Sequence, residues 1–401
     1  MSLSPRRGLS AHVDPERCLR HDGRAVLSPW KGLSAHVGPE RSLRGEGVHH
    51  AVNEKIVSRY VLVRQPDCME QGYREERVTL LAEGAELPAA LTLPVGQEVQ
   101  WRIVLIPGSM ANDVDGNYPG TNMNPHLYAD LARQLAQRGH AVLRYAKLSP
   151  ETGAVIVDEA QAAAHRLFPQ QQYIAAAACE KIRDLVPEAV GLALAGHSEG
   201  SVHGLILAQR PELAVDAFIS LSGPAFRYID LFIHMARSLE AEQGEIIDFG
   251  SFKVTAKNYI RAFELMREGQ PFTEEIKADP TMAFFVQNMD SNDAQPNAGQ
   301  QYMRDYDAVD PSAEISKVEC PVLIVQGGLD QSGVIADNGD RLYQARYAAR
   351  PDTTAKAFFA DLQHFYKRAT PGLTSYESML LDGETDERVA DAINQWLRGL
   401  R

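Results

Sequence analysis

The chain has 401 residues, 44% of them hydrophobic and 23% charged, and it carries a net charge of -13. This composition is ordinary for a globular protein and supplies enough apolar side chains for a sizeable core. The negative charge argues against nucleic acid and anionic membranes as partners, and no apolar run is long enough to span a bilayer.

The four cysteines are far apart in the sequence, at Cys18, Cys68, Cys179 and Cys320. They form no C-x-x-C pair and no histidines cluster around them, so we expect neither a zinc site nor a disulfide framework. Free thiols in a reducing compartment, the cytoplasm, are our expectation, with two ordinary bridges as the alternative. The first fifty residues lack the apolar segment of a signal peptide, which agrees with this location.

One segment occurs twice near the N-terminus. Residues 3–20 recur as residues 27–44, with changes only opposite positions 6, 7, 14 and 18. Two copies are too few for a solenoid. Residues 1–50 hold eight Lys or Arg against five Asp or Glu and show no apolar periodicity. We expect a disordered tail here, with a basic arm for an acidic partner as the alternative.

Strand-like segments dominate the next part of the chain. Ile56–Arg64, Arg77–Ala82 and Ala89–Leu93 are separated by turn residues, which predicts an antiparallel start to a sheet. Apolar strands then alternate with helices, which predicts a mostly parallel sheet covered on both faces, an α/β fold. The expected strands are Trp101–Ile106, Ala141–Tyr145, the segment from Gly191 and Ala214–Leu221, and the expected helices are Pro125–Arg138, Gln171–Val186 and Ser201–Ala208.

The alternation of strands and helices is interrupted by residues 225–317. This segment has helical patterns at Tyr228–Ala241, Phe252–Glu268, Phe272–Lys277 and Pro280–Met289. Strand and helix patterns return at Pro321–Gln326, Asn338–Ala348, Ala355–Phe359 and Asp386–Leu400. We therefore expect a core of residues 51–224 and 318–401. Residues 225–317, called the helical insertion below, are expected to lie over the carboxyl edge of the sheet as a lid.

The pentapeptide Gly196–Gly200 has the form G-x-S-x-G, with Ser198 at its centre. It follows an apolar strand and precedes an apolar helix. A serine held at such a sharp turn needs neighbours without side chains, so that strand and helix can pass each other. The pattern predicts a nucleophilic serine, with an ordinary strand-to-helix connection as the alternative.

A serine nucleophile needs a base, and the base needs an orienting acid. Asp330 follows the strand that ends at Gln326, and His364 follows the strand that ends at Phe359. Both lie at the carboxyl ends of strands, where sites in α/β sheets form. We predict a triad of Ser198, Asp330 and His364. Taken singly, Asp330 could be a turn residue and His364 a core histidine, and Asp361 is the nearest competing acid.

Two backbone N–H groups are expected to stabilise a developing oxyanion. We assign one to Glu199 and the other to Ser109, with Met110 as the second choice, because these residues follow the strand that ends at Ile106. Asn112, Asp113 and Asp115 resemble part of a calcium loop, but Ala111 and Asn122 occupy its first and last ligand positions. We expect no metal and no cofactor.

These motifs resemble those of the α/β-hydrolases. Residues from about 75 to 400 are similar to bacterial esterases related to dienelactone hydrolases, whose signatures are PGSGPxDRDGN, LRYDKRG, GHSEGG and a late PVLxxxGxxDxQV. Here these stand as Pro107–Asn117, Leu143–Lys147, Gly196–Ser201 and Pro321–Ser332. The sequence departs from these signatures at four places. Ala146 stands in place of an aspartate, Leu148–Pro150 in place of a glycine turn and Ser201 in place of a glycine, and residues 331–334 carry a glycine insertion or shift where the signature has QV. The departures leave the triad intact and fall around the substrate pocket.

The resemblance implies a carboxylesterase that acts on a small-molecule ester, as a monomer or small homo-oligomer. The alternatives are a peptidase or acyltransferase on the same triad, or an inactive ligand-binding protein. We expect His203 to be packed and the Glu199 side chain to bond the loop at 222–226. Four aromatic residues of the insertion could line an acyl pocket or simply pack: Tyr228, Phe232, Phe284 and Phe285.

Overall fold

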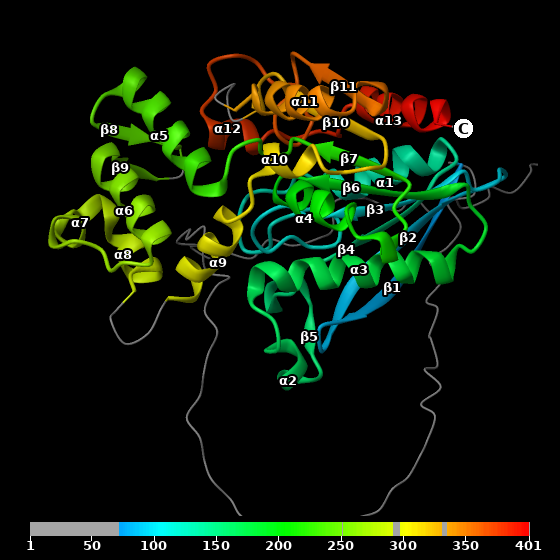
Figure 1. Ribbon diagram of the computed structural model, residues 1–401, viewed down its shortest axis with the longest axis horizontal. Coiled ribbons are helices and arrows are strands. Elements are labelled where there is room, and N and C mark those ends of the chain that lie inside the picture. Colours follow the sequence, from blue (N-terminus) through cyan, green and yellow to red (C-terminus); the bar gives the residue numbers. More distant parts are fainter. Residues whose placement is uncertain (1–71, 251, 292–296, 331–334, 401) are drawn as a thin grey trace, which may run out of the picture.

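The computed structural model describes residues 72–250, 252–291, 297–330 and 335–400 (Figure 1). The duplicated segment, the expected tail and the expected strand Ile56–Arg64 lie outside the described residues. So do Cys18, Cys68 and the shifted segment 331–334.

The core is a mixed sheet in the order β1-β2-β4-β3-β6-β7-β10-β11, with the short β5 paired to β2. The strands on one side, β1 and β2, pair antiparallel, and β2 pairs antiparallel with β4 and β5. All pairs from β4 through β11 are parallel. The bounds are β1 Tyr73–Ala82, β2 Ala85–Pro94, β3 Trp101–Ile106, β4 Ala141–Tyr145, β5 Val155–Ile156, β6 Gly191–His197, β7 Ala217–Leu221, β10 Val322–Gly327 and β11 Thr354–Phe359. This is the mostly parallel α/β sheet that the sequence predicts.

The antiparallel start is a tight hairpin. Glu83 and Gly84 connect β1 to β2, and both have positive φ, 50° and 67°. Two consecutive residues with positive φ form a type I′ turn, whose twist matches that of paired strands. The turn places Ala82 opposite Ala85. The two strands are longer than the segments expected from the sequence, because pairing extends through the polar residues that flank the apolar ones.

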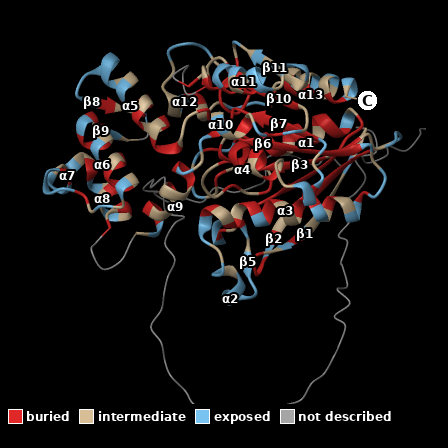
Figure 2. Ribbon diagram, viewed as in Figure 1, coloured by how far each residue is buried: buried red, intermediate tan, exposed pale blue. Residues whose placement is uncertain are grey.

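Helices cover both faces of the sheet. Successive side chains of a strand point to opposite faces. Ile103 and Leu105 of β3 pack in one cluster with α1 (Leu127–Gln137) and α13 (Glu387–Gly399). Val104 and Ile106 pack in another with α3 (Leu167–Leu185), α4 (Glu199–Leu207) and α11 (Asn338–Ala349). Figure 2 shows the resulting buried centre, with exposure concentrated on the outer helices and loops.

Most of the helical insertion lies beside the core, at the left of Figure 1. Its helices are α5 Tyr228–Gln243, α6 Ala256–Glu268, α7 Glu274–Ala278, α8 Ala283–Met289, α9 Ala298–Asp307 and α10 Pro311–Ile315. The last of these, α10, packs against the core helices α4 and α11. The expected helix from Phe252 is wrong at its start, because β9 (Lys253–Thr255) pairs there with β8 (Ile246–Asp248). The short α2 (Glu159–Ala162) and α12 (Ser375–Met379) were also not expected.

The insertion has its own apolar cluster and a group of ion pairs around Asp307. The cluster includes Phe263 and Tyr259 of α6 and reaches Val202 of α4 in the core. The buried carboxylate of Asp307 accepts hydrogen bonds from the Arg267 side chain at 2.8 Å and from the Ile229 backbone at 2.8 Å. Arg227 also pairs with Asp307, at 3.1 Å. Both ends of the insertion are thereby joined to α6.

Candidate active site

Ser198 lies at the turn between β6 and α4. Its backbone has φ 54° and ψ -122°, a conformation that a residue with a Cβ rarely adopts. The turn is possible because its neighbours are glycines. A Cβ on Gly196 would lie 2.1 Å from the carbonyl oxygen of Gly200, and one on Gly200 would lie 2.2 Å from that of Ile106. The expected strand–turn–helix is therefore present, and Ser198 is held in a strained conformation.

Asp330 and His364 are brought together from two strand ends. Nδ1 of His364 lies 2.7 Å from Oδ1 of Asp330, and the carboxylate is fully buried. The other oxygen, Oδ2, accepts a hydrogen bond from Gln326 at 2.7 Å. A carboxylate only accepts, so Nδ1 carries the proton and Nε2 of His364 is left to accept one. The competing acid, Asp361, instead pairs with Arg388 at 2.8 Å.

A chain of buried hydrogen bonds joins the His364 loop to the loop after β3. Nε2 of His197 lies 3.1 Å from the His364 carbonyl oxygen, which can only accept. Nδ1 of His197 therefore accepts from the Tyr128 hydroxyl at 3.3 Å, and that hydroxyl accepts from the Gly108 N–H at 2.8 Å. Burial and the neighbouring His364 ring lower the pKa of His197 well below its ordinary value, which keeps the ring neutral.

The loop after β3 passes directly over the serine turn. A Cβ on Gly108 would lie 3.3 Å from Cβ of Ser198, so the backbone approaches as closely as glycine allows. The next residues, Ser109 and Met110, line the same cavity as Ser198. The Glu199 N–H lies in the first turn of α4, where N–H groups have no acceptor within the helix. The two expected oxyanion donors thus lie on the two segments that meet at Ser198.

The Glu199 side chain is the centre of a buried charged cluster that the sequence did not reveal. Its Oε1 lies 2.6 Å from the Lys147 ammonium and 3.3 Å from Nε2 of His203, and its Oε2 accepts from the Ser109 hydroxyl at 3.0 Å. The expected bond from Glu199 to the loop at 222–226 is therefore wrong. His203 is fully buried against Phe168, as expected, but it also bonds Glu199.

Opposing effects act on the pKa of Glu199. Burial alone would raise it, but the Lys147 ammonium and the His203 hydrogen bond outweigh burial and hold the pKa well below its ordinary value. Burial lowers the pKa of His203, partly opposed by Glu199. The cluster therefore contains one carboxylate and one ammonium beside a neutral imidazole.

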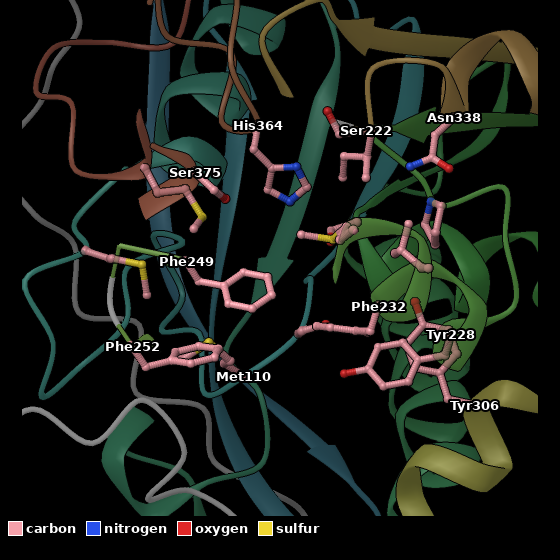
Figure 3. Close-up of a pocket in the computed structure, with 18 of the residues that line it drawn as sticks. Met110, Ser222, Tyr228, Phe232, Phe249, Phe252, Tyr306, Asn338, His364 and Ser375 are labelled. Carbon is pink, nitrogen blue, oxygen red and sulfur yellow. The ribbon is translucent and has the colours of Figure 1, made fainter. Parts of the chain in front are cut away.

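Ser198 and His364 open into a cavity of about 230 Å³ between the core and the insertion. Figure 3 shows the His364 ring pointing into this space, with Phe249 and Phe252 on one side and Phe232 and Tyr228 on another. Of the four aromatic residues considered from the sequence, Tyr228, Phe232 and Phe285 line the cavity. Phe284 instead packs edge-on against Phe285.

The described residues show neither a metal cluster nor a membrane-spanning helix. No three His, Cys, Asp or Glu side chains in the part of the chain that the structure describes are grouped so as to hold a metal ion. No helix among the described residues is both long and apolar enough to cross a membrane.

The sequence of the chain is similar to that of a known esterase. Esterase EstD of Thermotoga maritima is 22% identical over 333 residues, which cover 83% of this chain and 69% of EstD. No protein-family model matches the chain.

Two solved structures with a similar backbone fold are those of an esterase and a hydrolase. Brefeldin A esterase, described as a bacterial homologue of human hormone-sensitive lipase, is 16% identical with a TM-score of 0.48, covering 85% of this chain and 81% of its own. Dienelactone hydrolase from Anabaena variabilis is 15% identical with a TM-score of 0.41, covering 82% of this chain and 98% of its own. The fold assignment rests on the strand order and the serine turn themselves. The chain therefore has the α/β-hydrolase fold, and its sequence is similar to that of an esterase.

Proposed function

We propose that this protein is a carboxylic ester hydrolase that forms an acyl-enzyme on Ser198. The observation that carries the proposal is the convergence of three residues. Ser198 and His364 line one cavity, and His364 is hydrogen-bonded to the buried Asp330 at 2.7 Å. The similarity to EstD supports ester hydrolysis as the reaction class.

The proposed reaction follows from the proton positions. Nε2 of His364 takes the proton of Ser198 as the hydroxyl attacks the ester carbonyl, and returns it to the leaving alcohol. Asp330 holds the imidazole in the required tautomer and stabilises its cation. The N–H groups of Glu199 and Ser109 are assigned to the oxyanion. Water then attacks the acyl-enzyme by the same route, and the helical insertion acts as a lid over the cavity.

The test is a comparison of serine variants at the turn. Ser198→Ala should reduce kcat/KM for p-nitrophenyl butyrate by about 10⁴-fold or more, because the nucleophile is removed. Ser201→Ala is the matched control: its hydroxyl lies 2.7 Å from the Ser220 hydroxyl, and it does not line the cavity. His364→Ala and Asp330→Asn should also lose most activity. Turnover by Ser198→Ala within tenfold of the parent protein would contradict the proposal.

Two alternatives on the same residues give different products. An acyltransferase would pass the acyl group to an added alcohol faster than to water, and a peptidase would cleave an amino-acid p-nitroanilide. Product analysis with and without a primary alcohol separates these reactions from hydrolysis. A monomer or small homo-oligomer in the cytoplasm remains our expectation, and the free thiols of Cys179 and Cys320 are compatible with that compartment.

A further inference from the structure

The cavity wall opposite Ser198 is aromatic and is built by the insertion. Six rings supply it: Phe232, Phe249, Phe252, Tyr259, Phe263 and Phe285. They hold one another in place, since Phe232 stacks on Phe263 at 5.1 Å and Tyr259 meets Phe285 edge-on at 5.3 Å. Rings fixed in this way present both faces and edges to an occupant.

Ser109, Ser198, Ser222 and His364 form what is called the polar end of the cavity below. The other polar residues that line it are uncharged: Asn338, Ser375, Tyr118, Tyr228, Tyr259 and Tyr306. Among the described residues no Asp, Glu, Lys or Arg lines the cavity. A charged group placed against the aromatic wall would lose its hydration without a partner. The net charge of -13 further opposes the approach of an anionic substrate. The buried part of the substrate is therefore uncharged.

The size of the cavity limits what it can hold. An apolar cavity of about 150 Å³ accommodates a benzene molecule. The cavity here, about 230 Å³, leaves room for one ring and a short linker that reaches Ser198. Edge-to-face contacts favour an aromatic ring over a saturated group of similar size by about 2- to 10-fold for each well-placed pair. The volume of the cavity and its aromatic wall together favour an aromatic ring over a long alkyl chain.

We propose that the insertion forms an aryl-group site, and that the preferred substrates are small uncharged esters with one aromatic ring a bond or two from the ester group. The proposal rests on the proposed function and names its substrate class. The ring enters the aromatic wall while the ester carbonyl reaches Ser198 at the polar end.

The experiment measures kcat/KM of the full chain for matched esters. Methyl phenylacetate is paired with methyl cyclohexylacetate, and its isomer benzyl acetate with cyclohexylmethyl acetate, so that the ring is tested on either side of the ester. Monomethyl succinate supplies a charged acyl group. In at least one pair the aromatic ester should be preferred about 3-fold or more, and the succinate should be at least about 10-fold poorer than the better aromatic ester. Equal or better turnover of the saturated ester in both pairs, or succinate turnover within a few-fold, would overturn the proposal.

A pair of variants tests the wall itself. Phe249→Leu removes a ring that faces the cavity and should lower the aromatic-to-saturated ratio by about 2-fold or more. Phe272→Leu makes the same change at a buried position of the insertion that does not line the cavity, and it should keep the ratio. A ratio that falls equally in both variants would contradict an aryl site.

Failure of the proposed function would be seen separately. If no ester were hydrolysed, the hydrolase proposal would fail, and calorimetric binding of methyl phenylacetate against methyl cyclohexylacetate would test the aryl site alone. Tighter binding of the aromatic ester would then support the site, and equal binding would refute it. If esters were hydrolysed without an aromatic preference, only the aryl proposal would fail.

Discussion

Glu199 combines two tasks at the scale of a single residue. Its backbone N–H is assigned to the oxyanion, and its buried carboxylate joins the Ser109 hydroxyl, 90 residues earlier in the chain, to the Lys147 ammonium. The carboxylate therefore links the two loops that are proposed to supply oxyanion donors. A buried ion pair of this kind is costly to break, because the remaining charge loses its partner.

We predict that Lys147→Met destabilises the protein by about 3–5 kcal/mol at pH 7, measured by urea denaturation, because Glu199 is left charged and buried. The difference in unfolding free energy between the variant and the parent protein should become smaller at acid pH. In the parent protein the folded-state pKa of Glu199 is depressed, so its stabilising contribution is present above the ordinary pKa and is lost as pH falls through the folded value. Without Lys147, burial raises this pKa, and Glu199 takes up a proton more readily.

The double variant Lys147→Met with Glu199→Gln is the control for this prediction. It removes both charges, so it should recover part of the stability lost in Lys147→Met. A single Lys147→Met variant within about 0.5 kcal/mol of the parent protein, at pH 7, would show that the pair contributes little.

Tyr128 and His197 form a chain of hydrogen bonds that connects the loop of His364 to the loop after β3. It joins the Gly108 backbone to the His364 carbonyl through two buried side chains. The position of His364, the proposed base, is thereby tied to the loop that covers Ser198. His197 stands within the predicted pentapeptide, yet its role depends on contacts 69 and 167 residues away.

Among the elements of the insertion, α5, α6 and α9 are joined to one another at Asp307. This carboxylate ends α9, pairs with Arg267 of α6 and caps the start of α5 through the Ile229 N–H. The hydrogen bond to Asp307 raises the pKa of Arg267, so the guanidinium stays charged. Three rings of the aromatic wall, Phe232, Tyr259 and Phe263, lie on α5 and α6 and depend on these helices keeping their positions.

We predict that Asp307→Asn loosens the insertion more than the core, because the arginines lose their buried counter-ion. Hydrogen exchange measured by mass spectrometry should become faster in peptides of α5 and α6, while peptides of β6 keep their protection. Asp248→Asn removes the charge of an exposed pair with Lys253 and keeps an oxygen that can accept the Gly250 N–H, so it should leave exchange nearly unchanged. Equal acceleration throughout the molecule, or none in α5 and α6, would contradict the role given to Asp307.

At the scale of the whole molecule, the features that could be predicted are local in the sequence. Apolar strands ending in glycine turns are visible in a single segment, so Ser198, Asp330 and His364 could each be placed at a strand end. The short strands β8 and β9 could not, since each has only three residues and becomes a strand by pairing with the other. The Lys147–Glu199 pair and the bonds of His197 arise only when distant segments pack.

Trapping the acyl-enzyme is the most direct test of whether the reaction proceeds through a covalent bond to Ser198. The full chain is mixed with p-nitrophenyl butyrate, quenched in acid within the first turnovers, digested and mapped by mass spectrometry. We expect one butyryl group on the peptide that contains Ser198, and none there in Ser198→Ala. An acyl group on another residue, or sustained hydrolysis by Ser198→Ala at the parent rate, would contradict this mechanism.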